Sequence, residues 1–406
     1  MSNADSPLRS VHTDTLTQIL KTQGVSVALT TYQAGHVVLF REENGTTNTH
    51  FRSCQRPMGM AYHRGRLALG VARELVQFRN MPDAWTAPKD GEPPTPPDAC
   101  FMPRSLHVTG DIDIHEMAWG LPPETSGDTV ADTETDWNEL WFINTRFSCL
   151  CRLDREHSFV PHWRPPFVRG LSPQDRCHLN GLGMVDGRPK YVTALGATDE
   201  AGGWRDNKAC GGVLIDLDSD EIICSGLSMP HSPRWYDGKL WLLESGDGSI
   251  GTVDLQTGKY EAICHLDGFT RGMDFLGPFA FIGISQVRES AVFSGIPITK
   301  RLEQRISGMS VVDLRSGQEV AFARFEDQVQ EVFAVTVLPH RFPEMILLQH
   351  DLVSTTYSLS DESLRDVAWG NPAGAAAAAC DSDAADASDD AAAAAADKSD
   401  QPESAG

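Results

Sequence analysis

Polar side chains recur at one position of a repeated strand whose other residues are mostly apolar. Four residues before the aromatic or apolar residue that ends each strand stand Met58, His115, Asn180, His231, Arg271, Glu331 and Arg365. Two residues further back, Asp113 and His178 lie on the same strand face. Imidazole, carboxylate, amide and guanidinium groups bind ligands and transfer protons. Their convergence at one opening predicts a ligand site.

The histidines and Glu331 suit two kinds of chemistry. The candidate catalytic residues are His115, His178, His231 and Glu331, because imidazole and carboxylate groups serve as general acids and bases. A subset, His115, His231 and Glu331, is a candidate ligand set for a divalent Zn, Fe or Cu ion. In the alternative interpretation, the histidines are structural and Arg271 pairs with Glu331. The sequence contains no H-E-x-x-H or G-x-S-x-G motif that would fix the reaction.

Loops between the second and third strands of the repeats are expected to open at the same end as these polar residues. Several of them are long or charged, at 71–74, 144–148, 196–212 and 285–298. The candidate ligand-binding residues are Asn180, Arg271, Arg205, Lys208, Trp204, Arg146 and Arg288. A rim of cations attracts anions, and the arginine fork fits carboxylate or phosphate. We therefore expect an anionic small molecule or peptide as the ligand.

The strands that position these residues belong to an internal repeat of about 45 to 60 residues. Each repeat has a short strand, a turn with Gly or Asp, a strongly apolar strand, and a third strand. The first two strands of the repeats fall within 56–70, 113–144, 178–195, 229–245, 269–285 and 329–348. The third strands fall at 74–78, 148–154, 211–223, 248–263, 308–325 and 355–360. This period is typical of the blades of an all-β propeller.

Two partial repeats remain at the ends. Residues 26–40 and 49–54 would supply three strands of one more blade, and residues 363–370 its first strand. The sequence thus predicts a seven-bladed β-propeller whose first blade is closed by N- and C-terminal strands, since such closure removes open sheet edges. The expected domains are an N-terminal segment (1–24) with a short helix, the propeller (25–370) and a tail (371–406).

Composition and charge limit the kinds of partner that we expect this protein to bind. The chain has 406 residues, a formal net charge of −22 and 41% hydrophobic residues. The sequence has no excess of lysine and arginine with which to bind phosphate groups, so neither nucleic acid nor an anionic membrane surface is an expected partner. No secretory signal or long apolar run is visible, and the nine cysteines read as free thiols. We therefore expect a cytoplasmic protein. The Ala- and Asp-rich tail at 371–406 and the insertions at 83–98 and 120–137 are expected to be solvated.

Several long strings resemble a known family. They are HLNGLGMVDGRPKYVTALGATDEAGGWRDNKACGG, MPHSPRWYDGKLWLLESG, GFTRGMDF and TTYQAGHVVLF. They resemble bacterial conserved hypothetical proteins classed as a domain of unknown function, over roughly residues 25–350. The resemblance implies a propeller and carries no catalytic role. The matching strings include residues of the ligand site predicted at the opening of the central channel: Asn180, His178, His231, Arg271, Trp204, Arg205 and Lys208.

Two functions of different classes stay open at this point. The first is an enzyme, with or without a metal ion, that acts on an anionic small molecule or peptide at the channel mouth. The density of polar groups favours it, because buried polar groups cost stability unless they are satisfied. The second is a non-catalytic propeller that binds a protein or peptide, which the missing catalytic motif favours.

Overall fold

The computed structural model describes residues 8–85, 95–123, 137–286, 294–360, 362–363 and 365. The chain divides into two units, Met1–Thr355 and Thr356–Gly406. The first unit contains every described strand. The tail at 371–406, most of both insertions and Arg288 lie outside the described residues.

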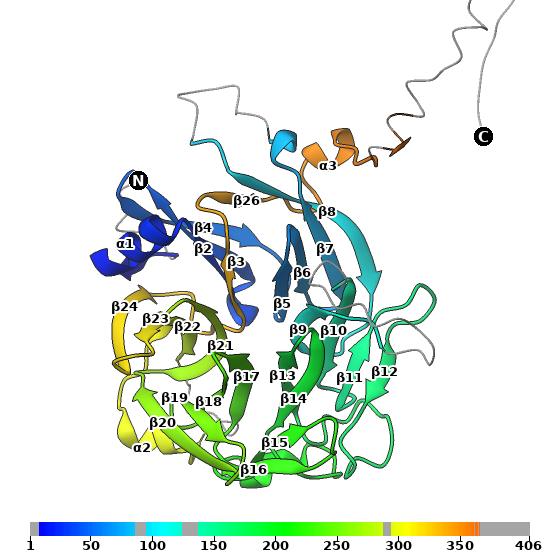
Figure 1. The fold of residues 1–406 in the computed structure, drawn as a ribbon, viewed down its shortest axis with the longest axis vertical. Coiled ribbons are helices and arrows are strands. Elements are labelled where there is room, and N and C mark those ends of the chain that lie inside the picture. Colours follow the sequence, from blue (N-terminus) through cyan, green and yellow to red (C-terminus); the bar gives the residue numbers. More distant parts are fainter. Residues whose placement is uncertain are drawn as a thin grey trace, which may run out of the picture. The chain divides into compact units, whose positions relative to one another are not determined.

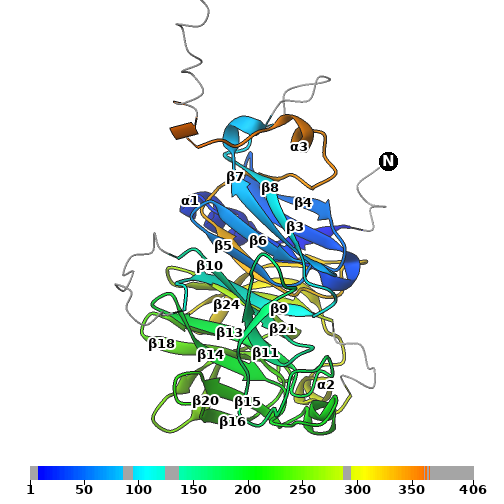
Figure 2. The same cartoon turned by 90° about the vertical axis from the view of Figure 1, so that its right-hand side faces the viewer.

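Six sheets, antiparallel except for one added outer strand, surround a common axis in the first unit and form the blades of a propeller (Figures 1 and 2). Blade 1 consists of β25 (Val335–Leu338), β2 (Ser26–Thr30), β3 (His36–Glu43) and β4 (Thr46–Ser53), and blade 2 of β5 (Met60–His63), β6 (Arg66–Gly70), β7 (Glu74–Asn80) and β8 (Ala99–Val108). Blade 3 consists of β9 (Ile114–Gly120), β10 (Glu139–Asn144), β11 (Cys149–Arg152) and β12 (Val160–Trp163), and blade 4 of β13 (Leu179–Val185), β14 (Arg188–Ala194), β15 (Gly212–Asp216) and β16 (Ile222–Leu227). Blade 5 consists of β17 (Pro230–Tyr236), β18 (Lys239–Glu244), β19 (Ser249–Asp254) and β20 (Lys259–His265), and blade 6 of β21 (Phe269–Leu276), β22 (Phe279–Ser285), β23 (Ser307–Asp313) and β24 (Gln318–Phe325).

The prediction of seven blades is wrong, because the described residues form six. The segment 329–348 is not a blade of its own. Its strand β25 pairs with β2 and takes the inner place of blade 1. Its strand β26 (Pro343–Met345) joins the outer edge of blade 2, parallel to β8. The closing strand predicted at 363–370 lies, apart from residues 363 and 365, outside the described residues and is not confirmed, and β25 holds the inner place of blade 1.

Short helices and one further strand complete the unit. The helix α1 (Asp14–Gln23) lies in the predicted N-terminal segment, with Thr13 as its N-cap and Gly24 in the left-handed conformation after it. The strand β1 (Ser10–His12) pairs with β24 and covers the outer edge of blade 6. The other helices are η2 (Tyr32–Ala34), η3 (Pro82–Ala84), η5 (Gly203–Asn207), α2 (Pro297–Arg301) and α3 (Leu352–Thr355). In the described ranges, no helix combines the length and apolar character needed to cross a membrane.

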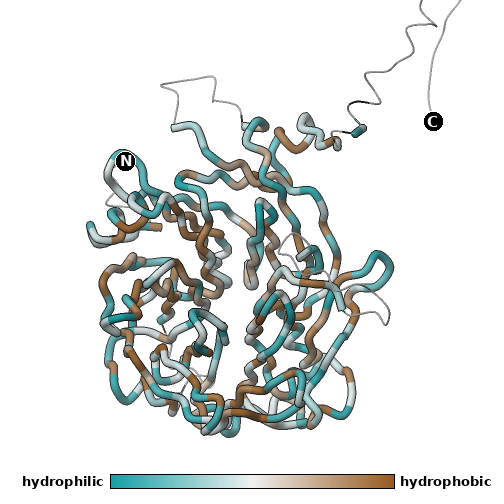
Figure 3. Tube along the Cα trace, in the orientation of Figure 1, coloured by the Kyte–Doolittle hydropathy of each residue, from teal (hydrophilic) through white to brown (hydrophobic). Residues whose placement is uncertain are grey.

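The inner strands pack closely because small residues of one blade face large residues of the next. A Cβ atom on Gly181 would lie 2.4 Å from the Pro233 side chain, so glycine lets blades 4 and 5 meet. Apolar residues between the blades form the cores, and Figure 3 shows many of them along the strands. The rigid inner ring that results carries the polar residues of the candidate site.

Candidate functional site

A β-bulge interrupts the inner strand of four consecutive blades near the polar position. Three steps along β9 (114–117) face two steps along β10, and β17 and β21 have the same extra residue after His231 and Thr270. In β13 the extra residue is Asn180. A bulge leaves one residue out of the ladder and redirects its side chain. The four bulges therefore take residues at or next to the polar position of blades 3 to 6 out of the regular strand alternation.

His115 lies at the centre of the cluster and is buried. Its Nδ1 is 2.7 Å from the hydroxyl of Thr145, which itself donates to the carbonyl of Leu179. The single hydroxyl proton is thus used, so the network assigns the imidazole proton to Nδ1. Its Nε2 then faces the guanidinium of Arg271 at 3.5 Å. Burial, followed by the charges of His178 and Arg271, lowers the pKa of His115 well below 6.5.

His231 has the same arrangement on blade 5. Its Nδ1 lies 2.9 Å from the carbonyl of Met229 and 2.9 Å from the Ser245 hydroxyl. A carbonyl only accepts, so Nδ1 carries the proton. Its Nε2 is buried and has no hydrogen-bond partner among the described residues, although the side chain is 3% exposed. Burial, followed by the charge of Arg271, lowers the pKa of His231 well below 6.5.

His178 is half-buried and belongs to a second, more accessible group. Its Nδ1 donates to the Asp175 carboxylate at 2.9 Å, and the same carboxylate accepts from Trp204 Nε1 at 3.0 Å. The ring of His178 lies 4.5 Å from the Trp204 ring and 4.8 Å from that of His115. The carboxylate therefore fixes the tautomer of His178 and leaves Nε2 as an acceptor.

Arg271 supplies the positive charge of the cluster. Its guanidinium lies over the ring of Phe333 at 4.1 Å, and its Nε is buried without a hydrogen-bond partner in the described part of the chain. Glu331 lies near enough for its charge to oppose the lowering of the Arg271 pKa by burial. Across the described ranges, however, no ion pair within 4.0 Å joins Arg271 to a carboxylate. The alternative in which Arg271 and Glu331 pair directly is therefore not observed.

A second polar layer adjoins the histidines. The carboxylate of Glu116 accepts from Arg234 Nη1 at 2.9 Å, from the Ser232 hydroxyl at 2.5 Å and from the Leu182 amide at 2.7 Å. Burial acts against the charge of Arg234, but Glu116 outweighs it and raises the arginine's pKa. This layer joins residues from blades 3, 4 and 5.

Two residues of the predicted cationic rim have carboxylate neighbours. Arg146 pairs with Asp111 and Asp113, at 3.0 and 3.2 Å, and Arg205 lies 3.4 Å from Asp175 while its guanidinium lies over the ring of Trp204. These carboxylates offset the charges of the two arginines. The rim as a whole stays a prediction.

The other predicted ligand-binding residues differ in their surroundings. Lys208 follows η5 as its C-cap residue. Asn180 is buried, donates to the carbonyl of Pro230 at 3.1 Å and accepts from Thr193 at 2.6 Å. Its amide thus links blades 4 and 5, which is a structural role.

The proposed metal set does not fit the geometry well. Among the described residues, no three His, Cys, Asp or Glu side chains are arranged to hold a metal ion. The rings of His115 and His231 are 6.4 Å apart at their centroids, and the Arg271 guanidinium occupies the space beside His115 Nε2. A cation at this place would be repelled by the guanidinium.

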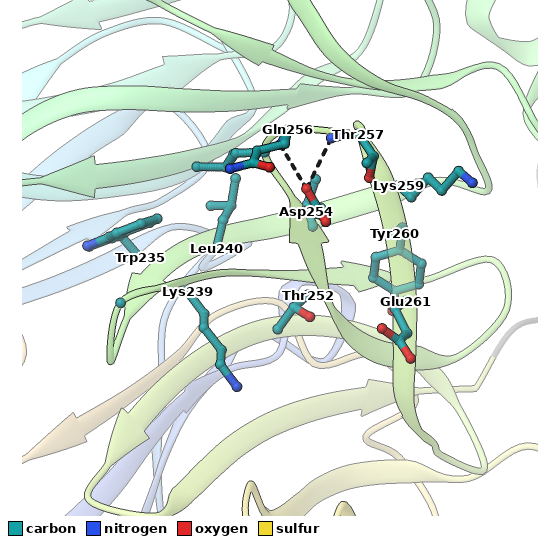
Figure 4. A pocket seen from close by; sticks show the side chains of 13 residues that line it. Trp235, Lys239, Leu240, Thr252, Asp254, Gln256, Thr257, Lys259, Tyr260 and Glu261 are labelled. Atoms are coloured by element: carbon teal, nitrogen blue, oxygen red, sulfur yellow. Dashed lines mark hydrogen bonds between the residues drawn. The ribbon is translucent and has the colours of Figure 1, made fainter.

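A separate hollow in the first unit has a different lining. It has a volume of about 960 Å³, lies along blade 5 and is lined by Trp235, Lys239, Tyr260 and Glu261, among others (Figure 4). Its Asp254 already accepts from the amides of Gln256 and Thr257, at 2.8 and 3.0 Å. This carboxylate caps its own turn, so it is not a candidate for ligand chemistry.

The repeat pattern in the sequence did not identify several residues of the site. Thr145 and Ser245 directly follow the second strands of blades 3 and 5, and their hydroxyls contact the Nδ1 atoms of His115 and His231. Asp175 precedes His178 by three residues, a spacing visible in the sequence, and Phe333 stands in the apolar column. Thr145, Ser245 and Asp175 could have been identified by looking for a hydroxyl or carboxylate on the strand or turn beside each histidine.

A family model described as "Domain of unknown function (DUF4915)" matches residues 14–347. No curated protein matches the chain significantly.

Among solved structures, a chain of a nidogen/laminin complex aligns with a TM-score of 0.47 and 10% identity, over 78% of this chain and all of that chain. A protein of unknown function from Bacteroides caccae aligns with a TM-score of 0.42 and 8% identity, over 78% of this chain and 99% of its own. The virginiamycin B lyase of Staphylococcus aureus aligns with a TM-score of 0.37 and 13% identity, over 64% and 73% of the two chains.

Proposed function

The chain belongs to the DUF4915 family, described as a domain of unknown function, and from the geometry of its own site we propose that it is an enzyme that binds a small anionic molecule and removes a proton from it. The site lies at the bulged ends of the inner strands of blades 3 to 6. It combines one guanidinium with three imidazoles whose Nδ1 atoms are held by protein acceptors.

Arg271 supports the anionic character of the ligand. The Arg271 side chain is half-buried, its Nε is fully buried, and no carboxylate among the described residues pairs with it, so a ligand carboxylate or phosphate would offset the cost of its desolvation. The stacking on Phe333 holds the plane of the guanidinium, which favours a ligand group with two coplanar oxygens. A carboxylate meets that requirement.

The observation that carries the proposal is the free Nε2 of His231. Within the described part of the chain no donor reaches this buried acceptor, which costs about 1–3 kcal/mol, and a ligand hydroxyl or N–H would satisfy it. The ligand therefore needs a carboxylate for Arg271 and a donor for His231. Hydroxy acids and amino acids with the two groups on neighbouring carbons meet both needs.

His178 is placed to act as the general base. It is the more accessible histidine, with a side chain 17% exposed, and Asp175 holds its Nδ1 proton. When Nε2 accepts a proton from the ligand, the resulting imidazolium is stabilised by that carboxylate. Arg271 meanwhile stabilises the negative charge that the ligand gains. The proton returns to the same carbon or to a neighbouring one.

Exchange of carbon-bound hydrogen tests this proposal. The protein is incubated in D₂O with a panel of α-hydroxy acids and amino acids, and loss of the α-proton signal is followed by NMR. At least one acid is expected to exchange, and His178→Asn is expected to abolish the exchange. The matched control is His157→Asn, since His157 forms the same i,i+3 pair with Asp154 on the surface. Tight binding without exchange would favour the non-catalytic binding propeller instead.

A further inference from the structure

The carboxylate of Glu116 is the junction of a partly buried network that touches four blades. It accepts from Arg234 Nη1 at 2.9 Å and Nη2 at 3.2 Å, and from Ser232 and the Leu182 amide. Arg234 also donates to the carbonyls of Leu182, at 3.0 Å, and Met273, at 3.2 Å. Glu116 belongs to blade 3, Leu182 to blade 4, Arg234 to blade 5 and Met273 to blade 6.

The ion pair of the network is partly buried. The side chains of Glu116 and Arg234 are 13% and 27% exposed. The geometry of a partly buried pair is better defined than that of a surface pair, because charge-assisted and bidentate bonds restrict it. Removing one partner leaves the other charge poorly solvated, so the pair acts as a unit.

The chain positions of these residues connect the network to the histidines. Glu116 directly follows His115, and Ser232 directly follows His231. His115 and Glu116 lie within the bulge of β9, whereas His231 is the last paired residue before the bulge of β17 and Ser232 lies within that bulge. Ser232 also has a φ of 52°, a left-handed conformation that its surroundings must impose. Ladder hydrogen bonds alone therefore do not fix these two segments.

We propose that Glu116 and Arg234 are positioning residues that hold the bulges of β9 and β17 and so aim the imidazoles of His115 and His231 into the site. The consequence for catalysis rests on the proposed function, but the positioning itself does not. Glu116 acts on the imidazole of His115 through the backbone that the two residues share. Arg234 acts through its ion pair with Glu116, whose carboxylate also accepts from Ser232, the neighbour of His231.

Imidazole NMR on the full-length protein tests this directly. Nitrogen-15 spectra report the tautomer and environment of each histidine without any ligand. Glu116→Gln keeps the shape of the side chain and removes its charge. We expect it to shift the Nε2 and Nδ1 signals of His115 and His231. Arg234→Lys, which keeps the charge and loses the fork, should shift the same signals.

The matched control is Glu344→Gln. Glu344 is equally exposed, at 13%, accepts from Arg52 and from the Met345 amide, and lies on β26 at the edge of blade 2. This variant should lose comparable stability and leave the signals of His115 and His231 in place. Should Glu116→Gln not fold, Arg234→Lys decides the question.

Unchanged signals of His115 and His231 in the folded variants would overturn the positioning role, as would equal shifts in Glu344→Gln. Failure of the wild-type protein to bind or exchange any acid would count against the proposed function alone, because the NMR comparison needs no ligand. If exchange is found, Glu116→Gln should lower kcat at least tenfold more than it raises KM, since Glu116 does not touch the ligand.

Discussion

At the level of single residues, the site consists of groups kept in one protonation state by burial and by fixed partners. His115 and His231 are neutral, with the proton on Nδ1. The sequence predicted which histidines gather, because they share one position of a repeated strand. It did not predict their tautomers, since these depend on Thr145, Ser245 and the carbonyl of Met229, which only the bulged backbone brings into reach.

The lowered pKa values of these histidines predict an acid-sensitive fold. Between 6.5, the value in the unfolded chain, and the lower value in the fold, the unfolded chain binds more protons. Stability is therefore present above pH 6.5 and is lost as the pH falls below it, by up to about 1.4 kcal/mol per pH unit for each histidine. Urea unfolding at pH 7.5, 6.5 and 5.5 measures this slope. His231→Gln should reduce it, while the exposed His157→Gln serves as control; a slope unchanged in His231→Gln would contradict the assignment.

At the level of the elements, the bulges and the ends of the second strands build the site together. Four inner strands carry an extra residue near the mouth, and a hydroxyl at the end of the second strand holds the histidine in blades 3 and 5. The alternation of apolar and polar residues predicts strands but does not reveal one extra residue within a strand, because the residues on either side of it still alternate. The polar residues at the shared strand position were therefore predictable from the sequence. The bulges at that position were not.

Thr145→Val tests the element-level account. The change keeps the shape of the side chain but removes the hydroxyl that joins His115 to the carbonyl of Leu179. We expect a loss of about 1–3 kcal/mol in the free energy of unfolding, because two buried groups lose a partner. Urea unfolding measures it, with Thr46→Val on the exposed edge of β4 as control. A loss no larger than that of Thr46→Val would show that Thr145 does not hold the ring.

At the level of the whole first unit, the ring closes through β25, which comes from a segment more than 300 residues away from its partner β2. The repeat pattern predicted a propeller and a blade shared by distant segments. It miscounted the blades because the segment 329–348 has the hydropathy of a repeat but supplies one inner strand and one outer strand to two different sheets. Pairing partners so far apart in the chain cannot be read from local periodicity.

Truncation separates the two closing strands. A chain that ends after Thr355 keeps all six described sheets and should melt at nearly the same temperature as the full chain. A chain that ends after Phe333 loses β25 and β26, exposes the inner edge of β2 and should aggregate or fail to fold. Thermal melting with size-exclusion chromatography checks both. Loss of folding in the longer chain would mean that residues beyond 355 are needed after all.

The most direct test of the central claim, that the cluster around Arg271 is an anion site, is the affinity of malate measured by calorimetry against that of its uncharged diamide. We expect malate to bind the wild-type protein at least about tenfold more tightly, equivalent to about 1.4 kcal/mol, and to bind more weakly as salt is raised. Arg271→Gln should remove this preference, while Arg315→Gln, in the exposed turn between β23 and β24, should keep it. Equal affinity for the charged and uncharged compounds, or a preference that survives in Arg271→Gln, would contradict the account.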